Sequence, residues 1–362
     1  MDDHISINKK NIIVVTVEIG EGGAERVLTE LMEEWSKKGH NVTLIQTMPG
    51  LYGRSYSVIE GIDNIDIHSN KKSKIGRYFE ETVALLKYLR TKPDSTVVAF
   101  ANASIRIVGV CSFFTPNRIV FSERCDPRFT PSSKKMRWLR DLLFGIADVC
   151  VFQTKDAKEL FPIKAQKNGV VIPNPINPHL PPVYSGERRK VIITASRLVP
   201  QKNLPMLINA FSKLVKEHPD YSLEIYGTGS EEKKLQELIK QLELYDCVKL
   251  MGHTSDIHDI MRKCSMYVCA SNYEGMSNSI LEALALGLPV VSTDHPIGGA
   301  REMINDKVNG LLVPVNNTDA LYKAMKYLIE NPDFAKYLGD NGSEIRDYWP
   351  VELIADRWIE LF

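Results

Sequence analysis

The stretch Glu274–Asp294, EGMSNSILEALALGLPVVSTD, shows most clearly which fold class this chain adopts. It follows an apolar run, Tyr267–Ala270, of the kind that forms a buried strand. A helix is predicted to begin near Ser277 and to end at Gly287, and Pro289 opens the next apolar run. A strand, a helix and a second strand in such close succession are typical of a parallel sheet covered by helices.

The same alternation of short apolar runs and helical patterns extends along the whole chain. In the first half, strands are predicted over 11–17, 41–46, 96–100, 118–121 and 148–152, and a helix over 24–38. In the second half, strands are predicted over 190–195, 222–226, 248–251, 266–270 and 289–293, with helices over 206–217, 230–241 and 344–362. The predicted fold class is therefore α/β.

A proline-rich segment, VIPNPINPHLPPVY, separates the two halves. Five prolines within ten residues exclude regular structure and make a semi-rigid connector. We therefore expect two Rossmann-like domains, over 1–172 and 187–343, joined by a hinge at 173–186. The terminal helical segment, 344–362, is expected to pack back on the first domain. Ligands of open α/β sheets gather at the carboxyl ends of the strands, so we expect the two domains to face each other across a ligand-binding cleft.

The composition is that of a soluble globular protein, with 44% hydrophobic and 25% charged residues among 362. No apolar run approaches the length of a transmembrane helix. The formal charge is zero overall, but residues 1–172 carry a net +5 and the remainder carries −5, which suggests two surfaces with different partners. The six cysteines form no C-x-x-C pair and indicate buried free thiols in a reducing compartment. We expect a cytoplasmic location and no nucleic-acid partner.

Two glutamates in the quoted stretch are the first candidate site residues. Glu282 stands in an otherwise apolar helix with no cation three or four residues away, so a buried carboxylate here needs a partner from elsewhere. The two hydroxyls of a ribose would suit it. The helix start at Gly275–Asn278 offers free N–H groups to an anionic or hydroxylated ligand. On the residues alone, a solvent-facing Glu282 and a helix-starting Glu274 are equally compatible with the pattern.

Other candidates lie in loops that follow predicted strands. Arg197 and Lys202 bracket a turn and could clamp a diphosphate, although two solvated loop cations would give the same pattern. Gly20-Glu-Gly22-Gly23-Ala-Glu25 is an incomplete dinucleotide fingerprint and could equally be a plain tight turn. Residues 122–128, SERCDPR, end a strand of the basic half.

These motifs together resemble those of one known family. Glu274 and Glu282, with seven residues between them, resemble the E-x7-E signature of the retaining glycosyltransferases of family 4, which have the GT-B fold. The resemblance covers nearly the whole chain, through GEGGAER at 20–26, VIPNP at 171–175, SRLVPQKN at 196–203, YGTG at 226–229 and MGH at 251–253. It is strongest to bacterial glycan-assembly enzymes that add N-acetylhexosamines to acceptors linked to polyprenyl diphosphate.

The resemblance implies a role for each candidate residue. The catalytic residues would be Arg197 and Lys202, which neutralise the departing nucleotide diphosphate, and Glu274, which holds the donor sugar. The donor site as a whole would comprise Gly22, Gly23, Arg197, Lys202, Gly252, His253, Glu274, Gly275, Met276, Ser277, Asn278 and Glu282. The acceptor side would comprise Glu25, Glu123 and Arg124, where many relatives carry a histidine near the last position.

We therefore expect a hexose or N-acetylhexosamine to move from a nucleotide-diphosphate sugar, UDP-linked by the resemblance, to a glycan or lipid-linked glycan, with retention of configuration. We expect no metal and no cofactor, because the chain has no D-x-D motif and no cluster of metal-ligand spacing. The rivals are a nucleotide-sugar epimerase or phosphorylase on the same plan, and a catalytically inactive nucleotide-sugar-binding subunit.

Two basic stretches raise the question of a membrane surface. One runs Lys71, Lys72, Lys74 and Arg77 before Tyr78 and Phe79. The other interleaves Lys134, Lys135, Arg137 and Arg140 with Met136, Trp138, Leu139, Leu142 and Leu143. Such helices can lie in the headgroup region of an anionic membrane, at the inner face of the cell membrane for a cytoplasmic enzyme. Ordinary amphipathic helices with solvated cations would show the same pattern.

Overall fold

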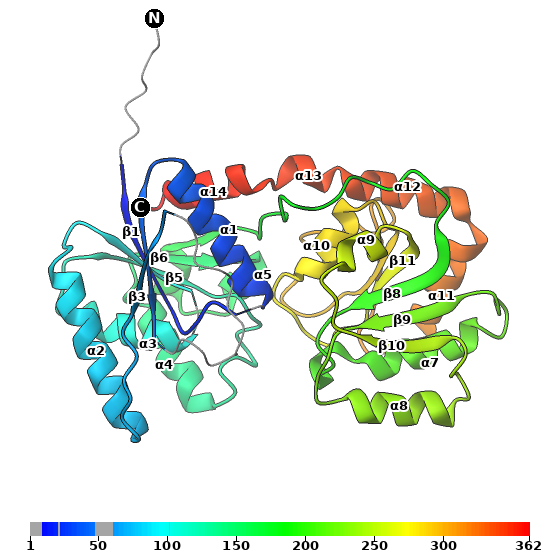
Figure 1. Cartoon of the computed structure of the whole chain (residues 1–362), viewed down its shortest axis with the longest axis horizontal. Helices are drawn as coiled ribbons and strands as arrows, with labels where there is room; N and C mark the ends of the chain where they lie inside the picture. Colours follow the sequence, from blue (N-terminus) through cyan, green and yellow to red (C-terminus); the bar gives the residue numbers. More distant parts are fainter. Residues whose placement is uncertain (1–8, 21, 48–60, 101) are drawn as a thin grey trace, which may run out of the picture. The chain divides into compact units, whose positions relative to one another are not determined.

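The computed structural model describes residues 9–20, 22–47, 61–100 and 102–362. The chain divides into two compact units, drawn in Figure 1. Unit 1 comprises Met1–Pro175 together with Val351–Phe362, and unit 2 comprises Ile176–Pro350. The division falls inside the proline-rich segment.

Unit 1 is built on a parallel sheet with the strand order β3-β2-β1-β4-β5-β6-β7. Its elements in chain order are β1 (Asn11–Thr16), α1 (Gly23–Lys37), β2 (Asn41–Gln46), β3 (Asp63–Asp66), α2 (Lys74–Arg90), β4 (Thr96–Ala99), α3 (Asn102–Cys111), β5 (Arg118–Ser122), α4 (Lys134–Phe144), β6 (Val149–Phe152), α5 (Lys155–Glu159), α6 (Ile163–Lys167), β7 (Gly169–Val171) and α14 (Val351–Ile359). From β1 the chain adds strands on one side, up to β3, and then returns to add β4 to β7 on the other side. The switch point of this Rossmann-like sheet therefore lies between β1 and β4.

The helices of unit 1 cover both faces of this sheet (Figure 1). Helices α2, α3 and α4 lie on one face, where Leu85, Val108 and Phe144 pack in one core with the sheet. Helices α1 and α14 lie on the other. Trp35 of α1 donates from Nε1 to the carbonyl of Ala355 at 3.3 Å, so the end of the chain is part of unit 1.

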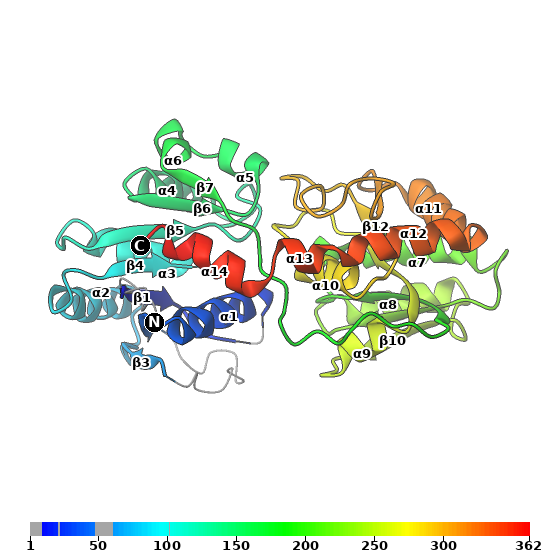
Figure 2. The same ribbon diagram turned by 90° about the horizontal axis from the view of Figure 1, so that it is seen from above.

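Unit 2 repeats the plan with the parallel strand order β10-β9-β8-β11-β12-β13. Its elements are β8 (Arg189–Ala195), the 3-10 turn η1 (Pro200–Lys202), α7 (Leu204–Leu214), β9 (Ser222–Tyr226), α8 (Glu232–Gln241), β10 (Val248–Gly252), α9 (Ile257–Met261), β11 (Cys264–Cys269), α10 (Asn278–Ala285), β12 (Val290–Thr293), β13 (Leu311–Val313), α11 (Thr318–Glu330), α12 (Pro332–Ser343) and α13 (Ile345–Tyr348). One core packs α7, α8 and α11 on the sheet, and a second packs α9 and α10 on it. Figures 1 and 2 show where these helices lie.

The predicted α/β class and the two Rossmann-like sheets are confirmed. One predicted element is wrong in detail, because the terminal segment 344–362 is not a single helix. It breaks between α13 and α14 at Trp349-Pro350, since a proline disfavours helical backbone at the residue before it. Helix α13 belongs to unit 2, and only α14 belongs to unit 1.

Four of the six cysteines are buried, whereas Cys125 is exposed and Cys247 is half-buried. Burial raises the pKa of the Cys111 and Cys150 thiols to about 12, so these side chains behave as small apolar core residues. None of the helices in the described part of the chain combines the length and apolar content that spanning a bilayer requires.

Candidate functional site

The candidate residues of unit 2 follow the carboxyl ends of its strands. The loop after β8 carries Arg197 and Lys202, and the loop after β11 carries Glu274. Strands β8 and β11 are neighbours in the parallel sheet, so their loops emerge side by side. The amide of Asn272 donates to the carbonyl of Gln201 at 2.8 Å and ties the two loops together. The strand order therefore brings together residues about 70 positions apart.

Glu274 and Lys202 form a buried ion pair. Glu274 is 8% exposed, and its Oε1 accepts from Nζ of Lys202 and, at 2.8 Å, from Oγ of Ser271. Its Oε2 accepts from Nε2 of Gln201 at 3.0 Å. Three donors offset the cost of taking this carboxylate out of water, so its position is fixed before any ligand arrives. Sequence reasoning gave the two residues separate tasks and missed both their contact and Gln201.

Arg197 is exposed, and no ion-pair partner contacts its guanidinium in the part of the chain that the structure describes. Its backbone, by contrast, is held firmly. The amide of Leu198 donates to the carbonyl of Thr228 at 2.9 Å. Gly227 adopts φ +123°, and a Cβ there would lie 1.9 Å from the carbonyl oxygen of Ser196. The glycine turn after β9 is needed for this close approach, which fixes the backbone on both sides of Arg197.

Glu282 lies in α10 and is 6% exposed. Its Oε2 lies 3.1 Å from Nε2 of His258, which comes from α9. The sequence predicts that a buried Glu282 needs a partner from outside its own helix. His258 of α9 is one such partner. Sequence reasoning missed His258, because no local periodicity links two residues 24 positions apart. The helix start that was predicted as a ligand cradle lies next to this pair: Gly275, Met276 and Ser277 are buried, and Asn278 is half-buried.

His295 is a second residue that sequence reasoning missed. It follows β12 and is fully buried, and its Nε2 has no hydrogen-bond partner among the described residues. Burial lowers the pKa of this imidazole, which keeps it neutral near Glu274 at physiological pH. Its loop packs tightly on the Glu274 loop, since a Cβ on Gly299 would lie 1.7 Å from the carbonyl oxygen of Gly275.

Gly252 is the last residue of strand β10, which pairs with β9, and His253 follows it. Gly252 has φ +70°, and its carbonyl accepts from the amide of Gly227 at 2.7 Å. His253 is exposed. The structure thus places both residues beside the loops that carry Arg197 and Gly227, at the same edge of the sheet.

The candidates of unit 1 also lie near strand ends. Gly22 and Gly23 are exposed at the start of α1, and Glu25 is half-buried in its first turn. Glu123, directly after β5, is 3% exposed, and its Oε1 accepts from the amides of Arg124 and Cys125, both at 3.1 Å. Burial raises the pKa of Glu123 to about 7.

Arg124 is 9% exposed and lies over the Phe100 ring, with 4.5 Å from Cζ to the ring centroid. Its Nη2 donates to Oδ1 of Asn174 at 2.6 Å, and burial lowers its pKa to about 9. Asn174 belongs to the VIPNP segment, so the structure joins the SERCDPR loop to the end of unit 1. The Arg124 guanidinium is thus held between the Phe100 ring and the Asn174 side chain.

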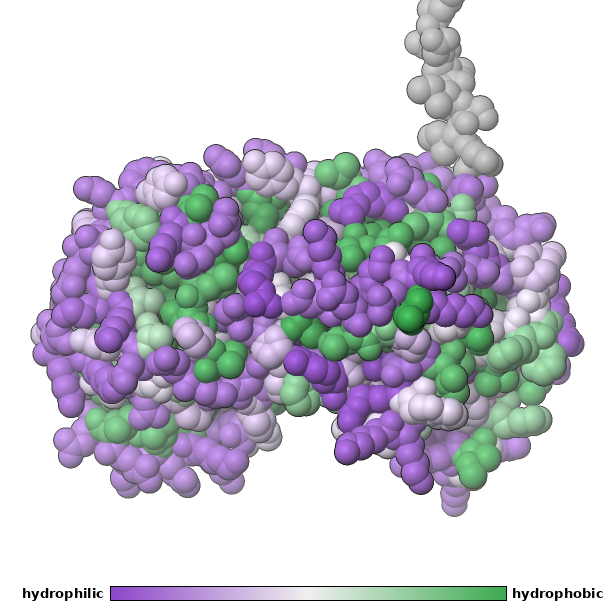
Figure 3. Space-filling view, turned by 180° about the vertical axis from the view of Figure 1, so that it is seen from behind, coloured by the Kyte–Doolittle hydropathy of each residue, from purple (hydrophilic) through white to green (hydrophobic). Residues whose placement is uncertain are grey.

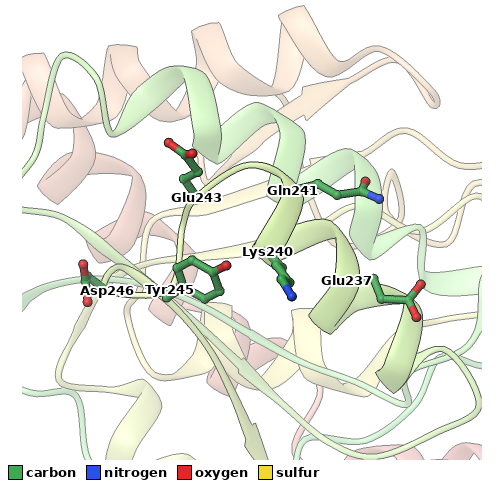
Figure 4. Close-up of a pocket in the computed structure, with 6 residues that line it drawn as sticks. All are labelled: Glu237, Lys240, Gln241, Glu243, Tyr245 and Asp246. Atoms are coloured by element: carbon green, nitrogen blue, oxygen red, sulfur yellow. The ribbon is translucent and has the colours of Figure 1, made fainter.

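One hollow in the surface of unit 2 lies apart from these residues. Figure 4 shows a hollow in unit 2 lined by side chains of α8 and the loop after it, and none of the predicted site residues lines it. In the described residues, no group of three or more His, Cys, Asp or Glu side chains has an arrangement that could hold a metal ion.

Comparison with known proteins places both units in glycosyltransferase families. Residues 21–180 match the family described as Glycosyltransferase Family 4, and residues 181–345 match Glycosyl transferases group 1. A Campylobacter jejuni protein, N-acetylgalactosamine-N,N'-diacetylbacillosaminyl-diphospho-undecaprenol 4-alpha-N-acetylgalactosaminyltransferase, is 30% identical over 88% of this chain and 90% of its own length. An uncharacterised glycosyltransferase of Haemophilus influenzae is 26% identical over 93% of this chain and 95% of its own length.

Solved structures show the same fold at lower identity. Anabaena HepE in complex with UDP and glucose has a TM-score of 0.83 at 20% identity, covering 97% of this chain and 98% of that one. A glycosyltransferase from Rickettsia africae has a TM-score of 0.79 at 21% identity, covering 98% of each chain. With two Rossmann-like units, both family matches and a relative 30% identical over most of its length, this chain is a glycosyltransferase that belongs to family 4 and has the GT-B fold.

Proposed function

We propose that this enzyme moves a hexose or N-acetylhexosamine from a UDP-linked sugar to a glycan carried on polyprenyl diphosphate, with retention of configuration. The acceptor for which one relative is named, and the ligands with which another similar protein was solved, support the proposal. The Campylobacter protein is named for transfer to a diphospho-undecaprenol-linked acceptor. Anabaena HepE, whose fold this chain shares, was solved with UDP and with UDP-glucose.

The buried Lys202–Glu274 pair beside Arg197 is the observation that carries the proposal. A nucleotide diphosphate brings two negative charges to the site, and Arg197 is held at the sheet edge with its guanidinium unpaired within the described chain. A donor sugar brings hydroxyls, which a fixed carboxylate such as Glu274 accepts. We assign Arg197 and Lys202 to the leaving diphosphate, Glu274 to the sugar and Glu282 to the ribose. The remaining donor contacts are assigned to the glycine loops and the start of α10.

In unit 1 we assign Glu25, Glu123 and Arg124 to the acceptor side. Glu123 has a pKa near neutrality, so it can accept a proton from a hydroxyl at physiological pH. Arg124 offers a cation where an acceptor phosphate would be recognised. These roles are ones of positioning and proton exchange, and catalysis itself would be chiefly electrostatic.

A direct assay tests which nucleotide sugar is the donor and whether the product keeps the anomeric configuration of the donor. The enzyme is incubated with a panel of UDP-, GDP- and ADP-sugars and a polyprenyl-diphosphate-linked acceptor, and product is followed by mass spectrometry and by NMR of the anomeric proton. We expect product from a UDP-sugar, with the anomeric configuration of the donor. An inverted linkage would refute retention, and product from another nucleotide sugar alone would refute the UDP assignment.

Release of nucleotide diphosphate separates this function from its rivals. A transferase releases UDP in proportion to acceptor. An inactive sugar-binding subunit releases none, and an epimerase converts the donor without releasing UDP. UDP release that needs the acceptor would support the proposal, and donor conversion in its absence would favour the epimerase.

We further predict that transfer does not require a metal ion. If Arg197 and Lys202 neutralise the diphosphate, initial rates after exhaustive treatment with EDTA should stay within about twofold of the untreated enzyme. The control adds excess Mg²⁺ or Mn²⁺ back to the treated enzyme, and neither should raise the rate. A rate that collapses on chelation and returns with metal would contradict this account of charge neutralisation.

A further inference from the structure

Three helices of unit 1 carry an exposed apolar surface. It consists of six side chains that are at least half exposed: Ile75 (83%) and Phe79 (66%) of α2, Phe113 (69%) and Phe114 (58%) directly after α3, and Trp138 (65%) and Leu142 (50%) of α4. We call this set the three-helix surface. In the space-filling view of Figure 3, apolar residues gather at the lower right, over unit 1.

Contacts between the helices place these side chains on one continuous face. Tyr78 of α2 donates from Oη to the carbonyl of Arg106 in α3 at 3.0 Å, and one turn later Cys111 of α3 donates to the carbonyl of Thr82 in α2 at 3.6 Å. Helix α4 packs against the other side of α3, because a Cβ on Gly109 would lie 2.6 Å from a Leu143 methyl carbon. Helices α2 and α3 therefore run side by side in the same direction, and α4 lies beside α3.

The exposed side chains are not a loosened part of the core. The opposite sides of the same helices are fully packed on the sheet, as the burial of Leu85, Val108 and Phe144 shows. The six residues thus form a second apolar face. Exposed apolar side chains are ordinary when they occur singly, but a contiguous set marks a contact surface.

The charges around this surface favour an anionic partner. Lys74 begins α2 and Lys72 lies just before it, Lys134 and Lys135 begin α4, and all four are exposed. None of these four lysines forms an ion pair among the described residues, and neither helix has an acidic residue in its first turn. Cations in the first turn oppose the helix dipole, so Lys74, Lys134 and Lys135 do not stabilise the helices in which they stand.

The structure also corrects the prediction for the basic stretch 134–143, because not all of its cations and apolar side chains are exposed. Arg140 is 5% exposed and donates inward to the carbonyls of Pro127 and Thr130. Arg137 donates to the carbonyls of Pro131 and Ser132. Leu143 is buried. Phe113 and Phe114, which the pattern did not single out, are instead among the most exposed aromatic residues described.

We infer that the three-helix surface docks on an anionic lipid bilayer. Its apolar side chains enter the headgroup region, and the lysines at the starts of α2 and α4 meet the lipid phosphates. A bilayer suits this surface better than a protein partner because its apolar side chains protrude from three helices, and the lysines at the starts of α2 and α4 are exposed and form no ion pair in the described chain. The inference goes beyond the proposed function, since it rests on the exposure and charge of this face and on no property of the donor site.

Vesicle flotation of the full chain tests the inference without donor or acceptor. We expect the protein to float with vesicles containing about one third phosphatidylglycerol at low salt, to float several-fold less at 0.5 M salt, and not to float with pure phosphatidylcholine. Each lysine near an anionic surface contributes about a fivefold gain in partitioning, so Lys134→Glu/Lys135→Glu should lower binding at least tenfold. Phe113→Ser/Phe114→Ser should lower it as strongly at any salt concentration.

Matched variants of unit 2 are the controls. Lys233→Glu/Lys323→Glu changes two exposed lysines, and Tyr245→Ser/Tyr348→Ser changes two aromatic residues that are 56% and 62% exposed. Both controls should float like the unmodified protein. Thermal unfolding shows that every variant is folded, and UDP release with a water-soluble acceptor should be unchanged in the Phe113→Ser/Phe114→Ser variant. That measurement separates loss of docking from loss of the proposed transfer reaction.

Trp138 provides an independent signal at the surface itself. Its indole fluorescence should shift to the blue with anionic vesicles and be quenched by brominated lipid, and both effects should disappear in Trp138→Phe. Absence of flotation with anionic vesicles at low salt would overturn the inference. So would flotation that survives Phe113→Ser/Phe114→Ser, or a dimer in light scattering that this variant abolishes, because the face would then bind a second copy of the chain.

Discussion

Arg197→Ala and Lys202→Ala are each expected to lower turnover by on the order of a hundredfold or more, as removal of one preorganised charge at a reacting group does. The charge that needs stabilising develops on the diphosphate as the glycosidic bond breaks. The loss should therefore fall mainly on kcat, with a smaller change in the KM for the donor. Steady-state kinetics with a saturating acceptor measures both constants.

The two variants should differ in stability. Arg197 is exposed and its guanidinium has no ion-pair partner in the described chain, so Arg197→Ala should unfold at the same urea concentration as the unmodified enzyme. Lys202 is paired with Glu274, which is 8% exposed, so Lys202→Ala leaves a buried carboxylate without its cation. We expect the free energy of unfolding to fall by about 3 kcal/mol, the lower end for a broken buried pair, because Gln201 and Ser271 still donate to Glu274.

A double variant separates the two tasks of Lys202. In Lys202→Ala/Glu274→Gln the unpaired charge is gone, so much of the stability should return while turnover stays low. Lys190→Ala is the matched control, because Lys190 is an exposed lysine of unit 2 that pairs with Asp220 at the surface. Near-normal kcat in both Arg197→Ala and Lys202→Ala would remove these residues from the mechanism. Turnover that recovers together with stability in the double variant would make Lys202 a structural residue only.

The fold could be predicted from the sequence because its parallel strands are buried on both faces. Such strands are unbroken runs of Val and Ile, and the helices between them end at glycine and proline. Strand β3, Asp63–Asp66, could not be predicted in this way because it is short, polar and at the sheet edge. The break at Pro350 did have a local signal, since proline at this position is incompatible with one continuous helix.

The candidate site was predictable only where a loop carries its own pattern. Four of the predicted site residues stand in such loops or beside them: Arg197, Lys202, Glu274 and Glu282. The residues that contact them could not be predicted from a local pattern, because the order of the strands in the sheet decides which loops meet. Lys202 and Glu274 are joined by the adjacency of β8 and β11, and His258 reaches Glu282 from a five-residue helix whose sequence gives no hint of that contact.

Glu282→Gln is expected to weaken UDP binding by roughly 1.5–3 kcal/mol, the contribution of hydrogen bonds to a charged acceptor. The amide keeps the shape of the side chain but accepts more weakly from the ribose hydroxyls. Isothermal titration with UDP measures the change, which corresponds to a dissociation constant about 10-fold to 150-fold higher. The contact between Glu282 and His258 raises a structural alternative, in which the carboxylate serves only to hold α9 against α10.

A ribose analogue decides between these two roles. The unmodified enzyme should bind UDP more tightly than 2′,3′-dideoxy-UDP, and Glu282→Gln should lose that preference because the discriminating carboxylate is gone. His258→Gln keeps a donor beside Glu282, so its UDP affinity should fall less than threefold. The matched control is Glu81→Gln in unit 1, since Glu81 is also 6% exposed and lies 3.7 Å from a histidine, His68. If Glu282→Gln lowers the unfolding temperature but still prefers the intact ribose, the carboxylate belongs to the scaffold and the ribose is held by other groups.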